Sequence, residues 1–438
     1  MPVTATSLDI LRGPLSGLPA AITLAPVGGA IDAVVTPPGS KSLANRALVL
    51  ALLGCGKTTL RNIPEEADDI EVMLAALPKL GAKVTRHEPG VYEIIGTFGK
   101  PIGGATLNLH NAGTAVRFLT AACALSAAPV TLDGDSRMRK RPIGGLIDAL
   151  RTLGANAEYV GEEGYPPVRV GGSDPKGWET SVEFGSTQSS QFISAVLLIA
   201  PFLPHDIEIS IAGEITSAPY LHMTAGMLSM LERSGGEDPV LGEFAVEPDA
   251  SGAAPFHAAN LIVPGSSITV SGIEEDSLQG DAQFATLLDS IKESDRIRAF
   301  DADLSDTPDT AMTLAVVACF ADGPSTIKGL RTLRVKETDR IAALVAELAK
   351  VGVVVEVFEH ESPGGNPDEG IRVNPPAGGL DCSADAAAVA FDTYDDHRMA
   401  MSLALIGLRR PNVTINDPAC VAKTYPRFWQ DLASLYRG

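Results

Sequence analysis

Cysteine is scarce in this sequence, and no two cysteines lie close together. The five present are spread from position 55 to position 420. An odd, scattered set excludes the disulfide framework of a small secreted domain, and it lacks the paired spacing of zinc and redox motifs. We therefore interpret the cysteines as reduced thiols and expect a cytoplasmic protein.

Long apolar runs are also missing. The longest, ALVLALL (47–53) and AVLLIA (195–200), fall far short of the ~20 residues that a membrane-spanning helix needs, and they suit buried helices. The N-terminal stretch lacks the basic start and apolar core that mark a secretory signal. We expect residues 1–20 to form an unstructured or loosely docked extension.

Positive charge is in short supply. The 438 residues include 34 Lys and Arg against 54 Asp and Glu, which gives a formal net charge of −20. This balance argues against non-specific binding to nucleic acid or to an anionic membrane. If the ligand is an anion, the cations that bind it must be gathered locally.

The sequence does contain a recurring pattern of leucines at helical spacing, then a glycine, then a short β-rich run. The leucines predict an amphipathic helix, the glycine a left-handed C-cap and the alternation after it a strand. Copies lie at 72–85, 146–160, 226–237 and 344–358, and 284–294 is a degraded copy. The pattern and the chain length predict α/β architecture in two domains made of a few small βα units.

Two Gly/Pro/Ser-rich stretches are candidate crossings between these domains. They lie at 36–40 and 247–255. If both belong to one hinge, residues 1–38 join the C-terminal half of the chain.

A cluster of cations stands at one predicted helix start, PGSKSLANRAL. Lys41, Ser42 and Arg46 lie where the free N–H groups and the dipole of a helix attract an anion. The stretch is no Walker phosphate loop. Nor is GCGKTT (54–59), which has Ala51 where that motif needs its first glycine and which we interpret as a turn into a strand. A solvated helix start is the alternative interpretation.

Two further stretches combine small and polar residues before an apolar helix. In HNAGTAVRFL (110–119), Asn111 or Thr114 is a candidate cap, and Gly113 lets a ligand approach the backbone. STQSSQF (186–192) offers hydroxyls and an amide to a hydroxyl-rich substrate, although capping by Ser189 explains it equally well.

The stretch RVKETDRIAAL predicts a helix with Lys336, Glu337 and Arg340 in its first turn. Lys336 and Arg340 would then share a face, where like charges repel mildly, so a negative group between them would explain the spacing. YDDHRMAM predicts another helix, with Asp395 or Asp396 as its N-cap. A metal site there is a poor alternative because no second histidine or cysteine cluster supports it.

Cations of this kind occur in both halves of the chain, several of them at helix starts. Together they indicate a substrate with two separated anionic groups. They are Lys41, Arg46, Arg141 (in RMRKRPIGG), Lys336, Arg340, Arg398 and Lys423.

Ordered blocks from about residue 25 to the C-terminus resemble those of the 5-enolpyruvylshikimate-3-phosphate (EPSP) synthase family. The blocks are PGSKSLANRAL, NAGTAVRFL, RMRKRPIG, SSQF, PDTAMTLA, RVKETDRI, DDHRMAM and DPACVAKTYPRF. The resemblance implies transfer of the enolpyruvyl group of phosphoenolpyruvate to the 5-hydroxyl of shikimate 3-phosphate, with release of phosphate and without cofactor or metal. It also implies that the protein acts in the shikimate pathway and that it is a monomer.

For the fold, the resemblance implies two similar α/β domains that close on the substrates. Each would consist of three βαβαββ units with helices inward, an inside-out α/β barrel, with the active site in the interdomain cleft. Residues 39–247 would form the N-terminal domain, mainly on the shikimate 3-phosphate side. Residues 1–38 and 248–438 would form the C-terminal domain, with the acid, the base and most phosphoenolpyruvate contacts, and hinges near 37–40 and 246–250.

The resemblance also implies roles for single residues. The shikimate 3-phosphate contacts would be Lys41, Ser42, Arg46, Ser189, Ser190, Gln191, Ser217, Asp309, Thr332 and Lys336. The phosphoenolpyruvate contacts would be Lys41, Gly113, Arg141, Gln191, Arg340, Arg398 and Lys423. The catalytic set would be Asp309, which accepts the hydroxyl proton, Glu337, which protonates and deprotonates the methylene carbon, and Lys41, Lys423 and His397.

Some positions depart from the family's pattern. His110 stands where glycine is usual, Phe118 where many members have proline, and Thr332 where some have asparagine. We hypothesise that Phe118 alters the affinity for glyphosate, the family's inhibitor, more than the affinity for substrates. The alternatives are the related UDP-N-acetylglucosamine enolpyruvyl transferase, whose Lys-Asn-Ala start and reactive loop cysteine are absent here, and a non-catalytic phosphometabolite-binding protein.

Overall fold

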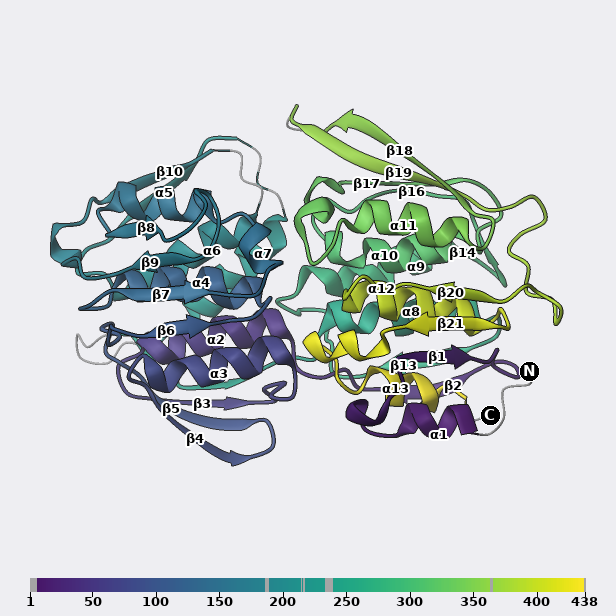
Figure 1. Cartoon of the computed structure of the whole chain (residues 1–438), viewed down its shortest axis with the longest axis horizontal. Coiled ribbons are helices and arrows are strands. Elements are labelled where there is room, and N and C mark those ends of the chain that lie inside the picture. The colour runs from purple at the N-terminus through teal and green to yellow at the C-terminus, as the bar shows by residue number, and fades with distance from the viewer. Residues whose placement is uncertain are drawn as a thin grey trace. The chain divides into compact units, whose positions relative to one another are not determined.

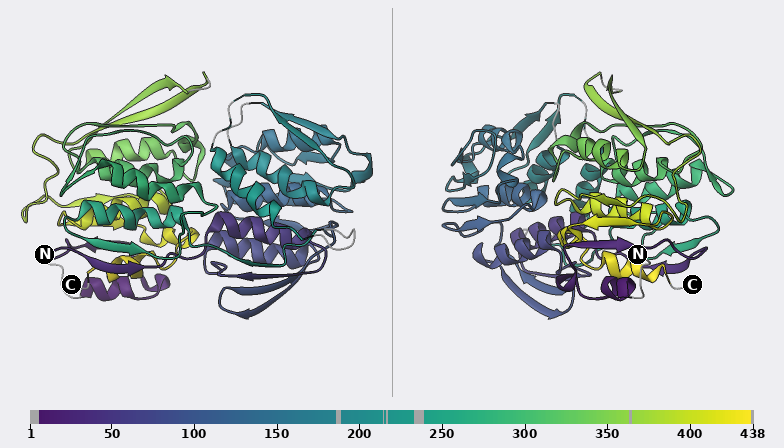
Figure 2. Two further views of the ribbon diagram at one scale, coloured as in Figure 1. Left: turned by 180° about the vertical axis from the view of Figure 1, so that it is seen from behind. Right: turned by 45° about the vertical axis from the view of Figure 1, so that its right-hand side comes forward.

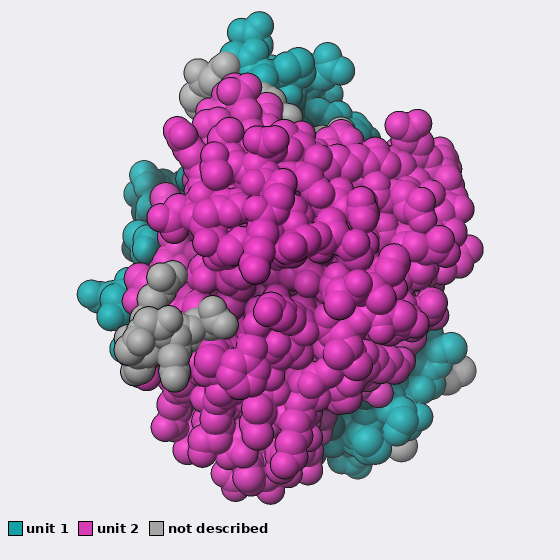
Figure 3. Space-filling model, turned by 90° about the vertical axis from the view of Figure 1, so that its left-hand side faces the viewer, with its two compact units in different colours: residues 1–37, 249–438 teal, residues 38–248 magenta. Residues whose placement is uncertain are grey.

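The computed structural model describes residues 6–185, 189–213, 215, 217–232, 239–362 and 365–436. The chain forms two compact units, which Figure 3 colours separately. Unit 1 comprises Met1–Pro37 and Asp249–Gly438, and unit 2 comprises Pro38–Pro248. The two ends of unit 2 meet, because the backbone N–H of Ser40 donates to the carbonyl of Glu247 at 2.7 Å.

Unit 2 contains a complete βαβαββ motif. Its members follow the order β6 (Thr106–Asn108), α4 (Gly113–Ala124), β7 (Val130–Asp133), α5 (Gly144–Leu153), β8 (Ala157–Tyr159) and β9 (Val168–Val170). The strands form one sheet in the order β6-β7-β9-β8, with β6 and β7 parallel and the other neighbours antiparallel. Helix α5 ends at the left-handed Gly154, with φ 107°, as the leucine–glycine pattern predicts.

Unit 1 repeats this motif with the same strand order. Its members are β16 (Asp301–Asp303), α10 (Ala311–Ala318), β17 (Ser325–Lys328), α11 (Arg340–Ala349), β18 (Val354–Glu361) and β19 (Pro367–Asn374). The sheet order is β16-β17-β19-β18, again with one parallel pair.

A third sheet of the same kind begins unit 2 and is completed by its end. Strand β12 (Glu243–Ala245) pairs parallel with β3 (Lys57–Arg61), which continues to β5 (Val91–Ile95) and β4 (Lys83–Glu88). GCGKTT is indeed a turn into a strand, since β3 begins at Lys57. The other elements of unit 2 are α2 (Lys41–Leu53), α3 (Asp68–Lys79), β10 (Ser181–Phe184), α6 (Ser190–Ile199), β11 (Glu208–Ile211) and α7 (Ala218–Ser229).

The remaining elements of unit 1 come from both ends of the chain. Strand β1 (Ala21–Leu24) pairs with β21 (Val413–Asn416), which also pairs with β20 (Val389–Phe391), and β2 (Asp32–Val35) pairs with β13 (Ser267–Val270). The others are α8 (Ala250–Ile262), α9 (Phe284–Ile291), β14 (Lys292–Glu293), β15 (Arg296–Ile297), α12 (His397–Gly407) and α13 (Phe428–Ser434).

Helices form the centre of each unit and sheets lie outside them, as Figures 1 and 2 show. In unit 2, α2, α4 and α6 pack on one another, and every residue of α4 is buried. In unit 1, α8, α10 and α12 do the same, and α10 is buried throughout. Helices that are buried on all sides need apolar or small residues all round, which explains ALVLALL and AVLLIA. The α/β fold class with inward helices is therefore confirmed.

The expectation of a loose N-terminal extension is wrong for residues 6–20. Helix α1 (Thr6–Arg12) packs on α13, and Leu11, 2% exposed, joins the core of unit 1. Gln430 also donates to the carbonyl of Gly13 at 2.9 Å. Apolar packing and pairing of β1 thus compensate the entropy of ordering this segment. Residues 1–5 lie outside the described part.

Within the described part of the chain, each helix is too short or too polar to cross a bilayer.

Candidate active site

In unit 1, the guanidinium of Arg340 contacts three carboxylates. Its Nε lies 2.8 Å from Asp396, its Nη1 2.9 Å from Asp309 and its Nη2 3.1 Å from Glu337. The Arg340 side chain is 2% exposed. One buried fork therefore fixes the positions of the residues predicted as proton acceptor and proton donor, Asp309 and Glu337.

Local structure explains how these groups meet. Asp309 lies in the 3-10 turn Pro308–Thr310 that precedes α10, and Arg340 is the first residue of α11. Asp396 is the N-cap of α12, where its side chain accepts from the backbone N–H groups of Arg398 and Met399. Each group thus lies at the N-terminal end of a helix. Helices α10 and α12 are central helices of unit 1 and α11 packs against α10, so the three helix starts lie close together.

The predicted helical turn around Lys336 is wrong. Residues Arg331–Val335 form a 3-10 helix, the chain is extended at Lys336, and α11 begins only at Arg340 because Asp339 caps it there. A negative group does lie between the two cations, as their spacing suggested. Asp309 Oδ1 is 3.2 Å from Lys336 Nζ and 2.9 Å from Arg340 Nη1.

These contacts govern the protonation of the cluster. Burial alone would raise the pKa of Asp309, but the positive charges of Lys336, Arg340 and Arg398 outweigh it and hold that pKa well below its usual range. Burial would lower the pKa of Arg340, yet Asp396, Glu337 and Asp309 raise it. Both groups are therefore ionised in the free protein.

The other predicted residues of unit 1 surround this cluster. Lys423 Nζ is 3.9 Å from Glu337 Oε1, and His397 Nδ1 is 3.9 Å from Asp396 Oδ1. Two buried polar atoms, Oγ1 of Thr332 and Nε of Arg398, have no hydrogen-bond partner among the described residues. Unpartnered buried donors are costly unless a ligand engages them, so both fit a binding role.

In unit 2, the opening helix stretch forms as predicted. Ser40 caps α2, and Lys41 Nζ forms an ion pair with the buried Asp69 at 3.0 Å. Arg46 is buried and donates to Thr224 Oγ1 at 2.8 Å and to the carbonyls of Ser42 and Tyr220. Burial lowers the pKa of Arg46 to about 10, so it keeps its charge at neutral pH.

Gly113 and Arg141 are in direct contact. A Cβ on Gly113 would lie 2.6 Å from Arg141 Nη2, so any larger residue would force the guanidinium out of this position. Arg141 in turn donates to the carbonyl and the side chain of Asn111, each at 3.1 Å. Neither Asn111 nor Thr114 caps α4; its N-cap is Ala112, without a side-chain bond, which corrects the prediction.

The serine-rich stretch also positions predicted residues. Ser189 caps α6, since its side chain accepts from the N–H of Gln191, and Ser190 is the first residue of the helix. The side chain of Gln191 bonds Thr114 of α4. Ser217 is the buried, left-handed N-cap of α7. Residues 186–188 of this stretch lie outside the described residues.

The comparisons with known proteins identify the family. The model of EPSP synthase (3-phosphoshikimate 1-carboxyvinyltransferase) matches residues 27–432. The chain belongs to the EPSP synthase family. The 3-phosphoshikimate 1-carboxyvinyltransferase of Janthinobacterium sp. (strain Marseille) is 40% identical over 437 residues, covering 92% of this chain and 95% of the relative. The same-named protein of Salmonella arizonae is 38% identical over 442 residues, and the match covers 94% of this chain and 98% of the relative.

Solved structures agree on the fold. EPSP synthase from Acinetobacter baumannii is similar with a TM-score of 0.73 at 22% identity, and the match covers 95% of this chain and 98% of that one. A second structure of that synthase has a TM-score of 0.70 at 21% identity, and the match covers 93% of this chain and 96% of that one. The EPSP synthase architecture is thus common to both proteins.

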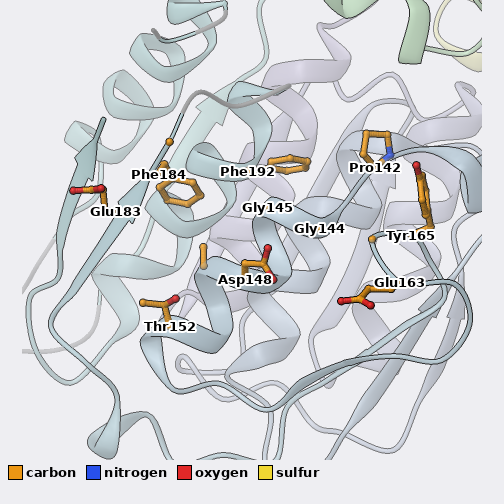
Figure 4. Close-up of a pocket in the computed structure, with 13 residues that line it drawn as sticks. Pro142, Gly144, Gly145, Asp148, Thr152, Glu163, Tyr165, Glu183, Phe184 and Phe192 are labelled. Atoms are coloured by element: carbon orange, nitrogen blue, oxygen red, sulfur yellow. The ribbon is translucent and has the colours of Figure 1, made fainter. Parts of the chain in front are cut away.

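A pocket of about 610 Å³ lies in unit 2, beside the start of α5 (Figure 4). Its lining includes Asp148, Glu163 and Glu183, and no Lys or Arg among the described residues. Carboxylates around a pocket repel anions. It is therefore not the place where a member of the EPSP synthase family would bind a phosphate ester.

Sequence reasoning missed several contacts of the predicted set, among them those made by three charged residues. Asp69 pairs with Lys41, Asp396 binds Arg340 in addition to capping α12, and Arg117 bonds Gln191. Arg117 stands in the block NAGTAVRFL, four residues after Gly113. That spacing, one helical turn from a predicted ligand contact, is the signal that could have found it.

Within the described ranges, no three His, Cys, Asp or Glu side chains gather as metal ligands would.

Proposed function

We propose that this chain transfers the enolpyruvyl group of phosphoenolpyruvate to the 5-hydroxyl of shikimate 3-phosphate, giving EPSP and phosphate. Membership of the EPSP synthase family and the names of the relatives support this reaction. The observation that carries the mechanism is the contact of one guanidinium, Arg340, with both Asp309 and Glu337. Such a contact holds an acid and a base in fixed positions.

The first step is addition. The 5-hydroxyl oxygen bonds to C2 of phosphoenolpyruvate while its proton passes to Asp309. The methylene carbon C3 takes a proton from Glu337, which must enter this step as the protonated carboxyl. C2 becomes electrophilic only when C3 is protonated, so both transfers are needed. Positioned acid and base groups contribute ~10²–10⁴-fold each.

The second step is elimination. The bond between C2 and the phosphate oxygen breaks, and phosphate leaves with the proton that Asp309 took from the hydroxyl. C3 returns its proton to Glu337, so both carboxyl groups regain their starting protonation. We assign Lys423 and His397 to this end of the reaction because Lys423 lies beside Glu337 and His397 beside Asp396. The positive charge of Lys423 and the N–H groups of both side chains would stabilise the departing phosphate.

Asp309 as found is a weak base, because Lys336 and Arg340 hold its pKa low. Anionic substrates would change this. A phosphate ester on Lys336 and a carboxylate on Arg340 would offset their positive charge and raise the pKa of Asp309. In this proposal the base becomes effective only when both substrates are bound.

Substrate contacts are proposed on both units. On unit 2, Lys41, Ser42, Arg46, Ser189, Ser190, Gln191 and Ser217 would bind shikimate 3-phosphate, and Lys41, Gly113, Arg141 and Gln191 phosphoenolpyruvate. On unit 1, the proposed contacts of shikimate 3-phosphate are Thr332, Lys336 and Asp309. Those of phosphoenolpyruvate are Arg340, Arg398 and Lys423. The unpartnered donors of Thr332 and Arg398 support their assignment.

The decisive experiment measures phosphate release from phosphoenolpyruvate with shikimate 3-phosphate, with UDP-N-acetylglucosamine and with no acceptor. Release that requires shikimate 3-phosphate supports the proposal. Release that requires the nucleotide sugar instead would show that the protein catalyses the related enolpyruvyl transfer to UDP-N-acetylglucosamine. Binding of both ligands without release would show a phosphometabolite-binding protein without this activity.

We further propose that the protein acts in the cytoplasm as a monomer. The few, widely scattered cysteines of the sequence fit a reducing compartment. Analytical ultracentrifugation at micromolar concentration tests the oligomeric state, and a dimer at that concentration would contradict it.

A further inference from the structure

Arg117 is a buried cation in unit 2 that the proposed mechanism does not use. It lies on α4 and is 6% exposed. Its Nη1 donates to Oε1 of Gln191 at 2.7 Å, its Nη2 to the carbonyl of Pro142 at 3.0 Å, and its guanidinium lies 5.4 Å from the ring centre of Phe192. These contacts connect the blocks NAGTAVRFL, RPIGG and SSQF.

The contact with Gln191 decides what that side chain can offer a ligand. A carboxamide has one oxygen that accepts and one nitrogen that donates twice. Because Arg117 can only donate, it selects the orientation in which Oε1 faces it. Nε2 then faces Thr114, to whose Oγ1 it donates at 3.2 Å.

One N–H of the Gln191 amide remains. Gln191 is partly exposed, and this second N–H has no partner among the described residues. The side chain therefore presents a donor. It can bond a substrate oxygen that accepts, such as a hydroxyl, carboxylate or phosphate oxygen.

We propose that Arg117 is a positioning residue that fixes the Gln191 amide as a hydrogen-bond donor to shikimate 3-phosphate. The inference rests on the proposed function, since that function supplies the ligand. Planarity matters here. The guanidinium fork reaches Gln191 and Pro142 at once while stacking near Phe192, and a lysine has neither the fork nor the flat face.

The test is a double-mutant cycle in the full chain, with Arg117→Met, Gln191→Ala and both together. For Arg117→Met we expect the KM for shikimate 3-phosphate to rise about tenfold, with kcat changed far less, because a bond from a charged donor is lost. In the Gln191→Ala background the same change should add almost nothing, since Arg117 acts through Gln191. Arg117→Lys should give an intermediate KM.

Arg151→Lys is the matched control. Arg151 also combines a backbone carbonyl, that of Ala157, with an aromatic ring, Tyr159 at 5.0 Å, but it contacts no predicted substrate residue. The KM values of the Arg151→Lys variant should equal those of the wild type. Equal thermal stability of Arg117→Lys and wild type excludes a folding effect on its KM.

Effects that multiply in the double variant, or an unchanged KM in both Arg117 variants, would overturn the inference. Absence of phosphate release by the wild type would instead overturn the proposed function, so the two failures are distinguishable.

Discussion

Lys41 Nζ lies 3.0 Å from Oδ2 of Asp69, a carboxylate that is almost fully buried. The pair joins the first residue of α2 to the first turn of α3. The lysine predicted to touch both substrates is thus held by an internal counter-charge. Its position depends on Asp69, a residue outside the set predicted to contact the substrates.

Asp69→Asn should therefore lower kcat/KM by about tenfold to a hundredfold, because Lys41 loses the charge that orients it. Steady-state kinetics with both substrates measure this. Glu93→Gln is the control, since Glu93 pairs with the exposed Lys57 in the same unit and should leave the kinetics unchanged. Equal losses in both variants would contradict a specific role of Asp69.

Asp309→Ala should abolish most turnover, by about 10²–10⁴-fold, while both substrates still bind. Removing the carboxylate leaves Lys336 and Arg340 without one of their counter-charges, which favours anion binding. Turnover and calorimetric titration measure the two effects. Loss of shikimate 3-phosphate binding would instead make Asp309 mainly a positioning group.

Gly113→Ala should weaken phosphoenolpyruvate binding more than shikimate 3-phosphate binding. The new Cβ would lie 2.6 Å from Arg141 Nη2 and displace the guanidinium. We expect a roughly tenfold rise in the KM for phosphoenolpyruvate. Gly177→Ala, whose Cβ would meet open space, is the control and should change neither KM.

Asp281 should make the stability of unit 1 depend on pH. It is 4% exposed, and burial raises its pKa to about 6 from an ordinary value of 3.8. Because the pKa of this carboxyl is higher in the folded protein than in the unfolded chain, the neutral carboxyl favours folding. This contribution to stability is fully present at pH values below the pKa of the unfolded chain, and it is lost as the pH rises through the pKa of the folded protein. The charged form at neutral pH therefore costs up to ~3 kcal/mol.

The variant Asp281→Asn removes that cost. Thermal unfolding should show it more stable than the wild type at pH 7.5 and no more stable at pH 4. Ser251, which bonds Asp281, can bond the amide as well. A variant that is less stable at pH 7.5 would show that the ionised carboxylate is stabilising, in contradiction to the raised pKa.

Local patterns made much of the fold predictable. The leucine–glycine pattern in residues 146–160 corresponds to α5, Gly154 and β8, and Ser40, Ser189 and Asp396 cap the helices predicted to follow them. Each depends on neighbours within a few residues. Single-sequence reasoning is most reliable at that range.

Contacts between distant residues were not predictable in the same way. Asp309 and Arg340 are separated by 31 positions, and Arg117 and Gln191 by 74. No periodicity reports such pairs. The motif order indicated which residues belong to the site, but the partner of each cation became known only from the fold. The roles of the individual site residues stay predictions until the variants above are measured.

The pairing of β1 with β21 has a consequence for synthesis on the ribosome. Chains emerge from the N-terminus, so β1 and β2 appear first, yet their partners β21 and β13 lie beyond the whole of unit 2. Unit 2 is continuous and has all its strands once β12 has emerged. We expect it to fold during translation, while β1 remains unpaired until β21, in the last quarter of the chain, has been made.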